Sequence, residues 1–335
     1  MQASDLIKAF RQLNILVIGD VMIDRYLFGQ VDRISPEAPV PIVDLERTED
    51  RLGGAANVAL NLASMGANPL IMSVIGAGQD AAICRQLFQE AGISDHFLIG
   101  DSNRPTTVKN RIWSKHQQLL RFDQESRDYL SEDLESQMMD QILRTLDTRN
   151  IKAIVFQDYN KGVCTERIIR KVMIESITRD VPVIVDPKKK SFFTYKRCSL
   201  FKPNLKEAID QVEEWPKDWK ESDLIHLGES LRKQLGGSQI MITLSDKGIF
   251  YMDDEISGIA PAKVRSVADV CGAGDSVVAV AALGRALNLD LPVIAAIANI
   301  AGGQVCERPG VVAIDQKSFQ KELNQTEVWK NYTIG

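Results

Sequence analysis

The chain has 335 residues, of which 44% are hydrophobic and 25% are charged. A chain of this length and composition is long enough to bury a large core, as one large domain or one domain with a small excursion. Its net charge of −5 gives no basic surface of the kind that binds nucleic acid or an anionic membrane. We therefore expect no nucleic acid and no membrane among its partners.

The cysteines and the first residues predict the compartment. The five cysteines are far apart and show no C-x-x-C spacing, so neither a disulfide framework nor a zinc site is indicated. Residues 1–11 carry charges within their apolar stretch and contain no cleavage-like site, and no run of about 18 apolar residues occurs. These features predict a soluble cytoplasmic protein.

Short apolar runs alternate with longer amphipathic segments along most of the chain. This alternation is typical of α/β proteins in which helices cover both faces of a mostly parallel sheet. Such sheets bind ligands beyond the C-terminal ends of their strands. The predicted strands are residues 15–19, 70–75, 153–156, 181–185, 199–201 and 240–244.

Two stretches depart from this alternation and predict strands outside the main sheet. Residues 26–47 contain three prolines, and residues 106–123 hold two apolar runs around a polar turn. Residues 210–221 are polar and predict a surface loop. With no internal repeat, the simplest organisation is a single domain over residues 1–335, with a small β lid from about residues 21–47 and 104–124.

A glycine-rich motif, D-V-C-G-A-G-D, occupies residues 269–275 and precedes an apolar helical segment at 276–283. Backbone N–H groups of Gly272, Ala273 and Gly274 at a helix N-terminus can hold a transferring phosphoryl group. Asp275 can then accept the proton of an attacking hydroxyl. A tight turn followed by a capping aspartate explains the same motif without any ligand.

A second glycine element begins at Gly53 and Gly54, enters a helix of small residues and ends at Gly66. The glycine pair would let a ligand touch the backbone. The amide of Asn57 can face sugar hydroxyls, or it can make ordinary hydrogen bonds in the first turn of the helix. This element alone does not choose between the two interpretations.

Residues 76–81 match G-x-G-x-x-A, the dinucleotide-binding fingerprint. The match follows the second predicted strand rather than the first, and only Asp95 is available as an acidic partner for a ribose. It would also leave the glycine-rich motif at 269–275 without a role. A nicotinamide-dependent dehydrogenase is therefore a less favoured alternative.

The two glycine elements, in this order and at this spacing, resemble the two signatures of the ribokinase (PfkB) carbohydrate kinase superfamily. Over roughly residues 10–320 the chain is similar to the D-glycero-D-manno-heptose 7-phosphate kinases of lipopolysaccharide-heptose synthesis, in the form without a fused nucleotidyltransferase domain. Cys271 departs from the Ser or Thr usual there, and residues 210–226 have no clear counterpart. The matching segments are residues 19–26, 33–41, 53–59, 117–121, 158–162, 186–188 and 203–207.

The resemblance implies a ribokinase-like three-layer fold, ATP and Mg²⁺ as cofactors, and Asp275 as the base beside the amides of residues 272–274. It implies that carboxylates and amides near the strand ends position the sugar. Cations on the lid or after strands are candidates for a sugar phosphate, with Arg111, Lys161 and Lys188 preferred over Arg25 and Lys109. The predicted substrate-binding residues are Asp20, Asp24, Arg25, Gly53, Gly54, Asn57, Arg111, Asp158, Lys161 and Lys188.

On the nucleotide side, Asn204 and Glu207 resemble the N-x-x-E element near the ATP phosphates, with Glu207 reaching Mg²⁺ through water. The same pair also fits a capping box that needs no ligand. Thr243, Ser245 and Gly248 surround a turn that would face the nucleotide, although turn chemistry explains them equally well. Asn299 is predicted near the adenine, or is a helix-surface amide.

The predicted reaction is ATP-dependent phosphorylation of the anomeric hydroxyl of D-glycero-D-manno-heptose 7-phosphate to the 1,7-bisphosphate. The alternatives are a kinase of the same superfamily for a fructose phosphate or ribose, and a noncatalytic sugar- or nucleotide-binding regulator. The open edges of the lid strands predict a homodimer in which two lids pair.

Overall fold

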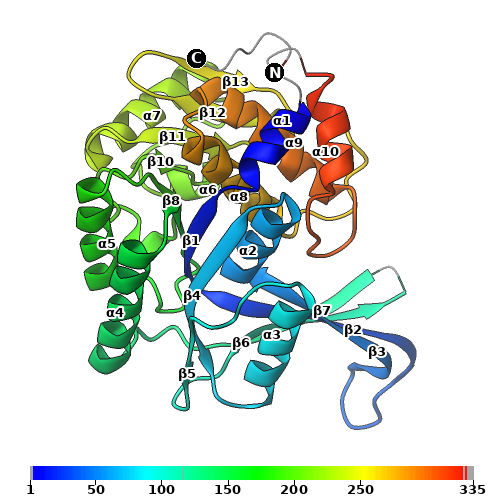
Figure 1. The fold of residues 1–335 in the computed structure, drawn as a ribbon. Helices are drawn as coiled ribbons and strands as arrows, with labels where there is room; N and C mark the ends of the chain where they lie inside the picture. Colours follow the sequence, from blue (N-terminus) through cyan, green and yellow to red (C-terminus); the bar gives the residue numbers. More distant parts are fainter. Residues whose placement is uncertain (1–2, 116, 327–328, 330–335) are drawn as a thin grey trace.

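A computed structural model describes residues 3–115, 117–326 and 329. Its main element is a nine-stranded sheet of order β13-β12-β11-β10-β9-β8-β1-β4-β5 (Figure 1). All neighbours from β11 to β5 pair in parallel, whereas β12 pairs antiparallel with β11 and with β13. The strands are β1 Asn14–Gly19, β4 Asn68–Gly76, β5 Leu98–Asp101, β8 Ile151–Gln157, β9 Val183–Asp186, β10 Leu200–Phe201, β11 Gln239–Thr243, β12 Ile249–Met252 and β13 Ser257–Ala260.

Alternate side chains of each strand enter two separate cores. In β1, Ile15 and Val17 join one hydrophobic cluster, and Leu16 and Ile18 join the other. This is the period of two that a strand buried on both faces imposes. The sheet is therefore the middle of three layers, as the sequence predicted.

Helices cover both faces of the sheet. The first cluster contains side chains of α1 Ala3–Phe10, α2 Ala55–Ser64, α3 Gln79–Glu90, α8 Ala273–Ala286, α9 Leu291–Cys306 and α10 Gln316–Leu323. The second contains α4 Glu132–Thr148, α5 Glu166–Thr178, α6 Leu205–Ile209 and α7 Glu221–Leu235. Short 3₁₀ turns occupy Lys189–Ser191 and Ser245–Lys247. Within the described residues, no helix has the length and apolar character needed to cross a membrane.

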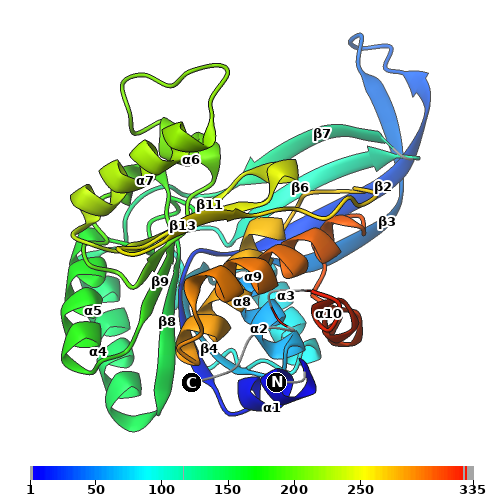
Figure 2. The same ribbon diagram turned by 90° about the horizontal axis from the view of Figure 1, so that it is seen from above.

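A second, four-stranded sheet forms the lid. Its order is β3-β2-β6-β7, and Figure 2 shows it extending away from the main body. Both stretches that were predicted to lie outside the main sheet, residues 26–47 and 106–123, contribute its strands. β3 continues past the predicted boundary at residue 47. All eight residues of the edge strand β7 are exposed. The strands are β2 Val21–Ile34, β3 Pro41–Gly54, β6 Thr107–Ser114 and β7 Gln117–Gln124.

The six predicted strands of the main sheet are all present, with ends displaced by one or two residues. The sequence did not predict β5, β12 and β13, which have four residues each and include both edge strands of the sheet. The helix after the glycine-rich motif begins at Ala273, earlier than the predicted segment. Ala273, Gly274 and Asp275 therefore form its first turn instead of a preceding loop.

The lid joins α2 through a backbone conformation that only glycine adopts without strain. Gly54 has φ 58° and ψ −131°, and the Ala55 N–H donates to the Asp20 carbonyl oxygen at 3.0 Å. A Cβ atom on Gly54 would lie 2.5 Å from that oxygen. The end of β1, the end of β3 and the start of α2 are thus packed backbone to backbone.

Gly54→Ala should lower the free energy of unfolding by about 2 kcal/mol or more, because it adds both backbone strain and a clash with a main-chain atom. Urea unfolding followed by circular dichroism measures the change. Gly100→Ala is the matched control, since its added Cβ would meet only a carbonyl oxygen at 3.8 Å. Equal stabilities of the two variants would contradict this account of the junction.

Candidate active site

The C-terminal ends of β1, β8 and β9 meet the N-terminus of α8, and Asp275 lies at this meeting point. Its side chain is 3% exposed. The helix begins after Gly272, which has φ 79° and supplies no side-chain cap. The first amides of α8 therefore point out of the helix without a capping side chain, as in sites that bind anions.

Three donors from three elements hold the Asp275 carboxylate. Asn57 of α2 donates its Nδ2 to Oδ2 at 2.8 Å. Tyr159, just after β8, donates its hydroxyl to Oδ1 at 2.8 Å, and Gln157 at the end of β8 donates its Nε2 to Oδ1 at 3.1 Å. The predicted pair of Asn57 and Asp275, far apart in sequence, is brought into direct contact.

Burial raises the pKa of Asp275 from its ordinary value of 3.8 to about 6. The hydrogen bonds from Asn57 and Tyr159 oppose this rise, while the charges of Asp186 and Asp24 add to it. The carboxylate is thus ionised near neutral pH and more basic than a solvated one. These properties suit a general base that works near its own pKa.

An aspartate and a lysine that the sequence analysis did not assign complete this cluster. Asp186, the last residue of β9, accepts from Gln157 Nε2 at 3.1 Å and pairs with Lys202 Nζ at 3.1 Å. Lys202 is 2% exposed. A Cβ built on Gly274 would lie 3.8 Å from both partners, so this buried ion pair flanks the first turn of α8.

Asp20 organises the loop after β8. Its carboxylate accepts the backbone N–H groups of Tyr159, Lys161 and Val163 at 2.8–3.1 Å. Burial raises its pKa and the three backbone donors lower it, with a net rise. The geometry gives Asp20 a role in shaping the loop, and its contact with sugar hydroxyls stays a prediction.

Asp24 lies within β2, which begins at Val21, directly after Asp20. It forms a buried ion pair with Arg111 of β6. Gly53 of β3, which pairs with Met22, makes room for this ion pair, since a Cβ there would lie 2.1 Å from Asp24 Oδ2. Asp24, Gly53 and Arg111 are therefore brought together where the lid joins the main body.

Four of the five candidate phosphate-binding cations, all but Lys109, already have a carboxylate partner. Besides the Arg111 pair, Lys188 pairs with Glu207. Asp158, also predicted to bind substrate, accepts the Tyr195 hydroxyl and the Asn160 N–H. The two other paired cations are Arg25, which contacts Asp50 and Asp80, and Lys161, which contacts Glu125.

Lys109, the fifth candidate, and Arg104, which was not predicted, are without a carboxylate partner among the described residues. Arg104 donates to the carbonyl oxygens of Asp128 and Lys161, and it lines a small pocket with Asp20 and Ser126. Lys109 of β6 places its Nζ 4.7 Å from the ring centroid of Tyr159. The sequence preference for Lys161 and Lys188 over Lys109 is thus not favoured by the geometry.

The acidic side chains in and after the G-x-G-x-x-A match at residues 76–81 form ion pairs within the protein. Its Asp80 pairs with Arg25 of the lid at 2.9 Å. Asp95, the only acidic ribose partner that the sequence offered, pairs with Arg85 at 2.9 Å. Ion pairs within the protein therefore account for both of these acidic side chains without a dinucleotide.

The residues predicted for the nucleotide are also engaged by the protein. Asn204 and Glu207 form the capping box of α6. Gly248 has φ +102°, and a Cβ on it would lie 2.0 Å from the Ala260 carbonyl oxygen. Asn299 donates to the carbonyl oxygens of Ala260 and Pro261. Thr243 forms a bridge with Asn204, and Ser245 begins a 3₁₀ turn at φ 58°. Contact of these residues with ATP stays a prediction.

A mostly parallel sheet with a β lid and a buried carboxylate at an uncapped helix N-terminus agree with the ribokinase-like architecture that the resemblance implied. The sequence profile of the pfkB family carbohydrate kinases matches residues 12–317, and the chain belongs to this family. The structure of phosphofructokinase-2 from Escherichia coli in complex with potassium superimposes with a TM-score of 0.75 and 17% identity. That alignment covers 92% of this chain and 97% of the other, and it confirms the fold.

Closer sequence similarity is found to proteins named bifunctional protein HldE. The one from Nitratiruptor sp. is 41% identical over 310 residues, and the one from Methylobacillus flagellatus is 37% identical over 313 residues. The alignments cover 92% and 93% of this chain and 64% of each relative. The chain thus spans just under two thirds of the length of these relatives.

The raised pKa of Asp275 predicts a pH dependence of stability. Because the folded-state pKa of about 6 lies above the ordinary 3.8, the folded protein binds more protons in this range than the unfolded chain. The wild-type protein therefore loses stability as pH rises from about 4 to about 6. Asp275→Asn removes this loss. The free energy of unfolding of the variant, relative to that of wild type, should therefore rise across this pH window by up to about 3 kcal/mol.

Urea unfolding of both proteins at several pH values between 4 and 7 measures this difference. Asp246→Asn, in an exposed turn, is the control for the loss of one carboxylate. A difference between Asp275→Asn and wild type that stays constant with pH would contradict the raised pKa.

Proposed function

We propose that the protein phosphorylates the anomeric hydroxyl of D-glycero-D-manno-heptose 7-phosphate with ATP, giving the 1,7-bisphosphate. The observation that carries the kinase chemistry is Asp275, a buried and ionisable carboxylate in the uncapped first turn of α8. Membership of the pfkB family supports sugar phosphorylation. The choice of heptose rests on the sequence resemblance described above.

In the proposed reaction Asp275 takes the proton of the anomeric hydroxyl while that oxygen bonds to the γ-phosphorus. The bond between the γ-phosphorus and the β–γ bridging oxygen breaks, and ADP leaves with that electron pair. The first amides of α8 stabilise the charge that develops on the transferring group. Lys202, held beside them by Asp186, adds a fixed positive charge.

The residues at the nucleotide side fit a phosphate group better than a protein-held metal. The N-terminal end of α8 has open space beside Gly274, because a Cβ atom added to this glycine would meet no neighbouring atom closer than 3.8 Å. Among the residues that the structure describes, no three metal-ligating side chains gather. Mg²⁺ would then be held by phosphate oxygens and water, with Glu207 reached through water, and would neutralise phosphate charge.

The charges on the sugar side favour a phosphorylated sugar over ribose. Arg104 and Lys109 offer donors that no described carboxylate neutralises. A phosphate is a strong acceptor for both kinds of cation. A fructose phosphate carries the same group, so it is the competing substrate within this family. The free cysteines suit a reducing compartment, and we propose that the protein acts in the cytoplasm.

The open lid supports a homodimer. The edge strand β7 leaves its backbone unpaired on one side, and Leu120 and Phe122 are 55% and 48% exposed. Exposed edges and apolar side chains of this kind are covered in stable proteins. A second lid related by a two-fold axis would cover both.

The test of the proposed reaction is a panel of sugars with ATP and Mg²⁺. D-glycero-D-manno-heptose 7-phosphate should be phosphorylated with the highest kcat/KM, ahead of fructose 6-phosphate, fructose 1-phosphate and ribose. Asp275→Asn should bind ATP normally but lower kcat by about a thousandfold, because the hydroxyl loses its proton acceptor. ADP release and isothermal titration measure the two quantities.

Preference for another sugar would keep the kinase chemistry and discard the heptose. Near-normal turnover by Asp275→Asn would remove Asp275 from the base role. ATP binding without turnover on any sugar would favour a noncatalytic regulator.

The dimer makes a separate prediction. The wild-type chain should sediment as a dimer, and Leu120→Lys combined with Phe122→Lys should sediment as a monomer, because two charges would then face the paired lid. Ile174→Lys on α5 is the control, since Ile174 is 60% exposed away from the lid. A wild-type monomer in analytical ultracentrifugation would refute the pairing.

A further inference from the structure

Tyr159 lies in the second position after β8 and was not assigned a role from the sequence. Its backbone N–H donates to Asp20, so its main chain is fixed from one side. Its hydroxyl donates to Asp275 Oδ1 at 2.8 Å. Tyr159 therefore connects two carboxylates that come from different ends of the chain.

The three donors around Asp275 divide unequally between its two oxygens. Oδ1 accepts from Tyr159 and from Gln157, whereas Oδ2 accepts only from Asn57. A carboxylate oxygen offers about two lone-pair positions. Both positions of Oδ1 are thus taken, and one position of Oδ2 remains for a further donor.

The orientation of the Gln157 amide is fixed by its neighbours. Its Nε2 lies 3.1 Å from both Asp186 Oδ2 and Asp275 Oδ1, and both contacts require a donor. The Tyr159 hydroxyl is likewise confined to donating. Burial raises its pKa well above 10, and the nearby Asp275 and Asp186 charges add to that rise. Neither group can release Oδ1 by changing its protonation near neutral pH.

Two lysines surround the Tyr159 ring. Lys109 of the lid lies 4.7 Å from the ring centroid, and Lys188, which pairs with Glu207, lies 5.3 Å from it. Cations over an aromatic face attract the ring and hold its plane. The ring therefore has contacts on the lid side and on the side of α6 that fix the direction of its hydroxyl.

We propose that Tyr159 is a positioning residue for Asp275: its hydroxyl, together with the Gln157 amide, holds Oδ1, so that Oδ2 takes the proton from the attacking sugar hydroxyl. The inference rests on the proposed role of Asp275 as the base. A rigid base whose free lone pair already points to the reactant avoids reorganisation during the reaction.

The competing possibility is that the Tyr159 hydroxyl stands where the sugar hydroxyl binds and is displaced by it. Removing the hydroxyl would then leave kcat unchanged or raise it, and KM would fall. Under the proposal the opposite split is expected, with a lower kcat and a KM close to wild type.

Tyr159→Phe tests the hydroxyl alone, because the ring and its two lysine contacts are retained. The pKa of Asp275 is followed by ¹³C NMR of protein labelled at the aspartate Cγ, with the resonance assigned by its absence from Asp275→Asn. Loss of one donor to the carboxylate should raise this pKa by about one unit and lower kcat about tenfold. Other charged groups near Asp275 are Asp24, Asp186, Lys109, Lys188 and Lys202.

Tyr195→Phe is the matched control, because it removes a buried tyrosine hydroxyl from Asp158 and not from Asp275. It should leave the Asp275 pKa at the wild-type value. Gln157→Met removes the other Oδ1 donor and should raise the pKa in the same direction as Tyr159→Phe, which keeps the test valid if one variant fails to fold.

An unchanged Asp275 pKa and unchanged kcat in Tyr159→Phe, in a preparation whose wild type is active, would overturn the inference and leave the proposed function intact. If the wild type were inactive but Tyr159→Phe raised the pKa of Asp275, the proposed function would be contradicted. The hydrogen bond from Tyr159 to Asp275 Oδ1 would still be supported. The NMR titration needs no sugar, so the two failures are distinguishable.

Discussion

Burial of the Asp275 carboxylate is the constraint on which the rest of this site depends. An ionised carboxylate removed from water is costly unless donors replace its hydration. Here the donors come from α2, from the end of β8 and from the loop after it. Each of these elements must be held in place for Asp275 to remain charged. Asp20 holds the loop after β8, and Gly54 allows the close packing at the start of α2. Both residues therefore stabilise the Asp275 charge indirectly, through the donors that these elements carry.

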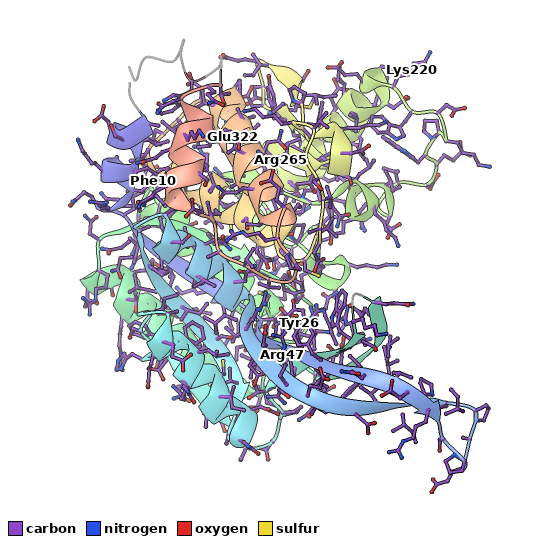
Figure 3. The ribbon with its side chains drawn as sticks, turned by 90° about the vertical axis from the view of Figure 1, so that its right-hand side faces the viewer. Phe10, Tyr26, Arg47, Lys220, Arg265 and Glu322 are labelled. Atoms are coloured by element: carbon purple, nitrogen blue, oxygen red, sulfur yellow. The ribbon has the colours of Figure 1, made fainter. Side chains whose placement is uncertain are left out.

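The lid shares a structural support with the glycine-rich motif. Tyr26 lies where the lid meets the main body (Figure 3), and its hydroxyl accepts the Val311 N–H at 3.0 Å. Arg51 of β3 donates to the carbonyl oxygens of Pro309 and Val311. Asp269, at the start of the motif, accepts the N–H groups of Gly310 and Cys271. The turn at residues 309–311 therefore contacts both the base of the lid and the segment that leads into α8. Figure 3 also shows Arg265, which precedes the glycine-rich motif, beside Glu322 of α10. This ion pair connects the segment before α8 to α10.

The sequence predicted those features that are encoded locally. Apolar periodicity located the central strands, and the two glycine elements located α2 and α8, because these signals depend on neighbouring residues. It did not predict β5, β12 and β13, whose four-residue runs carry little periodicity. It missed Gln157, Tyr159, Asp186 and Lys202 as a cluster, because their partners lie on separate strands and only the sheet order β10-β9-β8 brings them together. The position of Gln157 and Asp186 as last residues of adjacent parallel strands was the signal that could have found them.

Ion pairs within the protein bear on which cations are available to bind an anion such as a phosphate. A lysine or arginine that already contacts a carboxylate must lose that partner, or share it, before it binds phosphate, and the buried Arg111–Asp24 pair would leave an uncompensated charge behind. Arg104 and Lys109 carry no such cost, since their contacts are carbonyl oxygens and an aromatic ring. Burial even lowers the pKa of Lys109, against the raising effect of the Asp24 and Asp275 charges, so an arriving phosphate would stabilise its charged form. The electrostatics of this part of the molecule thus depend less on how many cations the lid contains than on which cations lack a carboxylate partner.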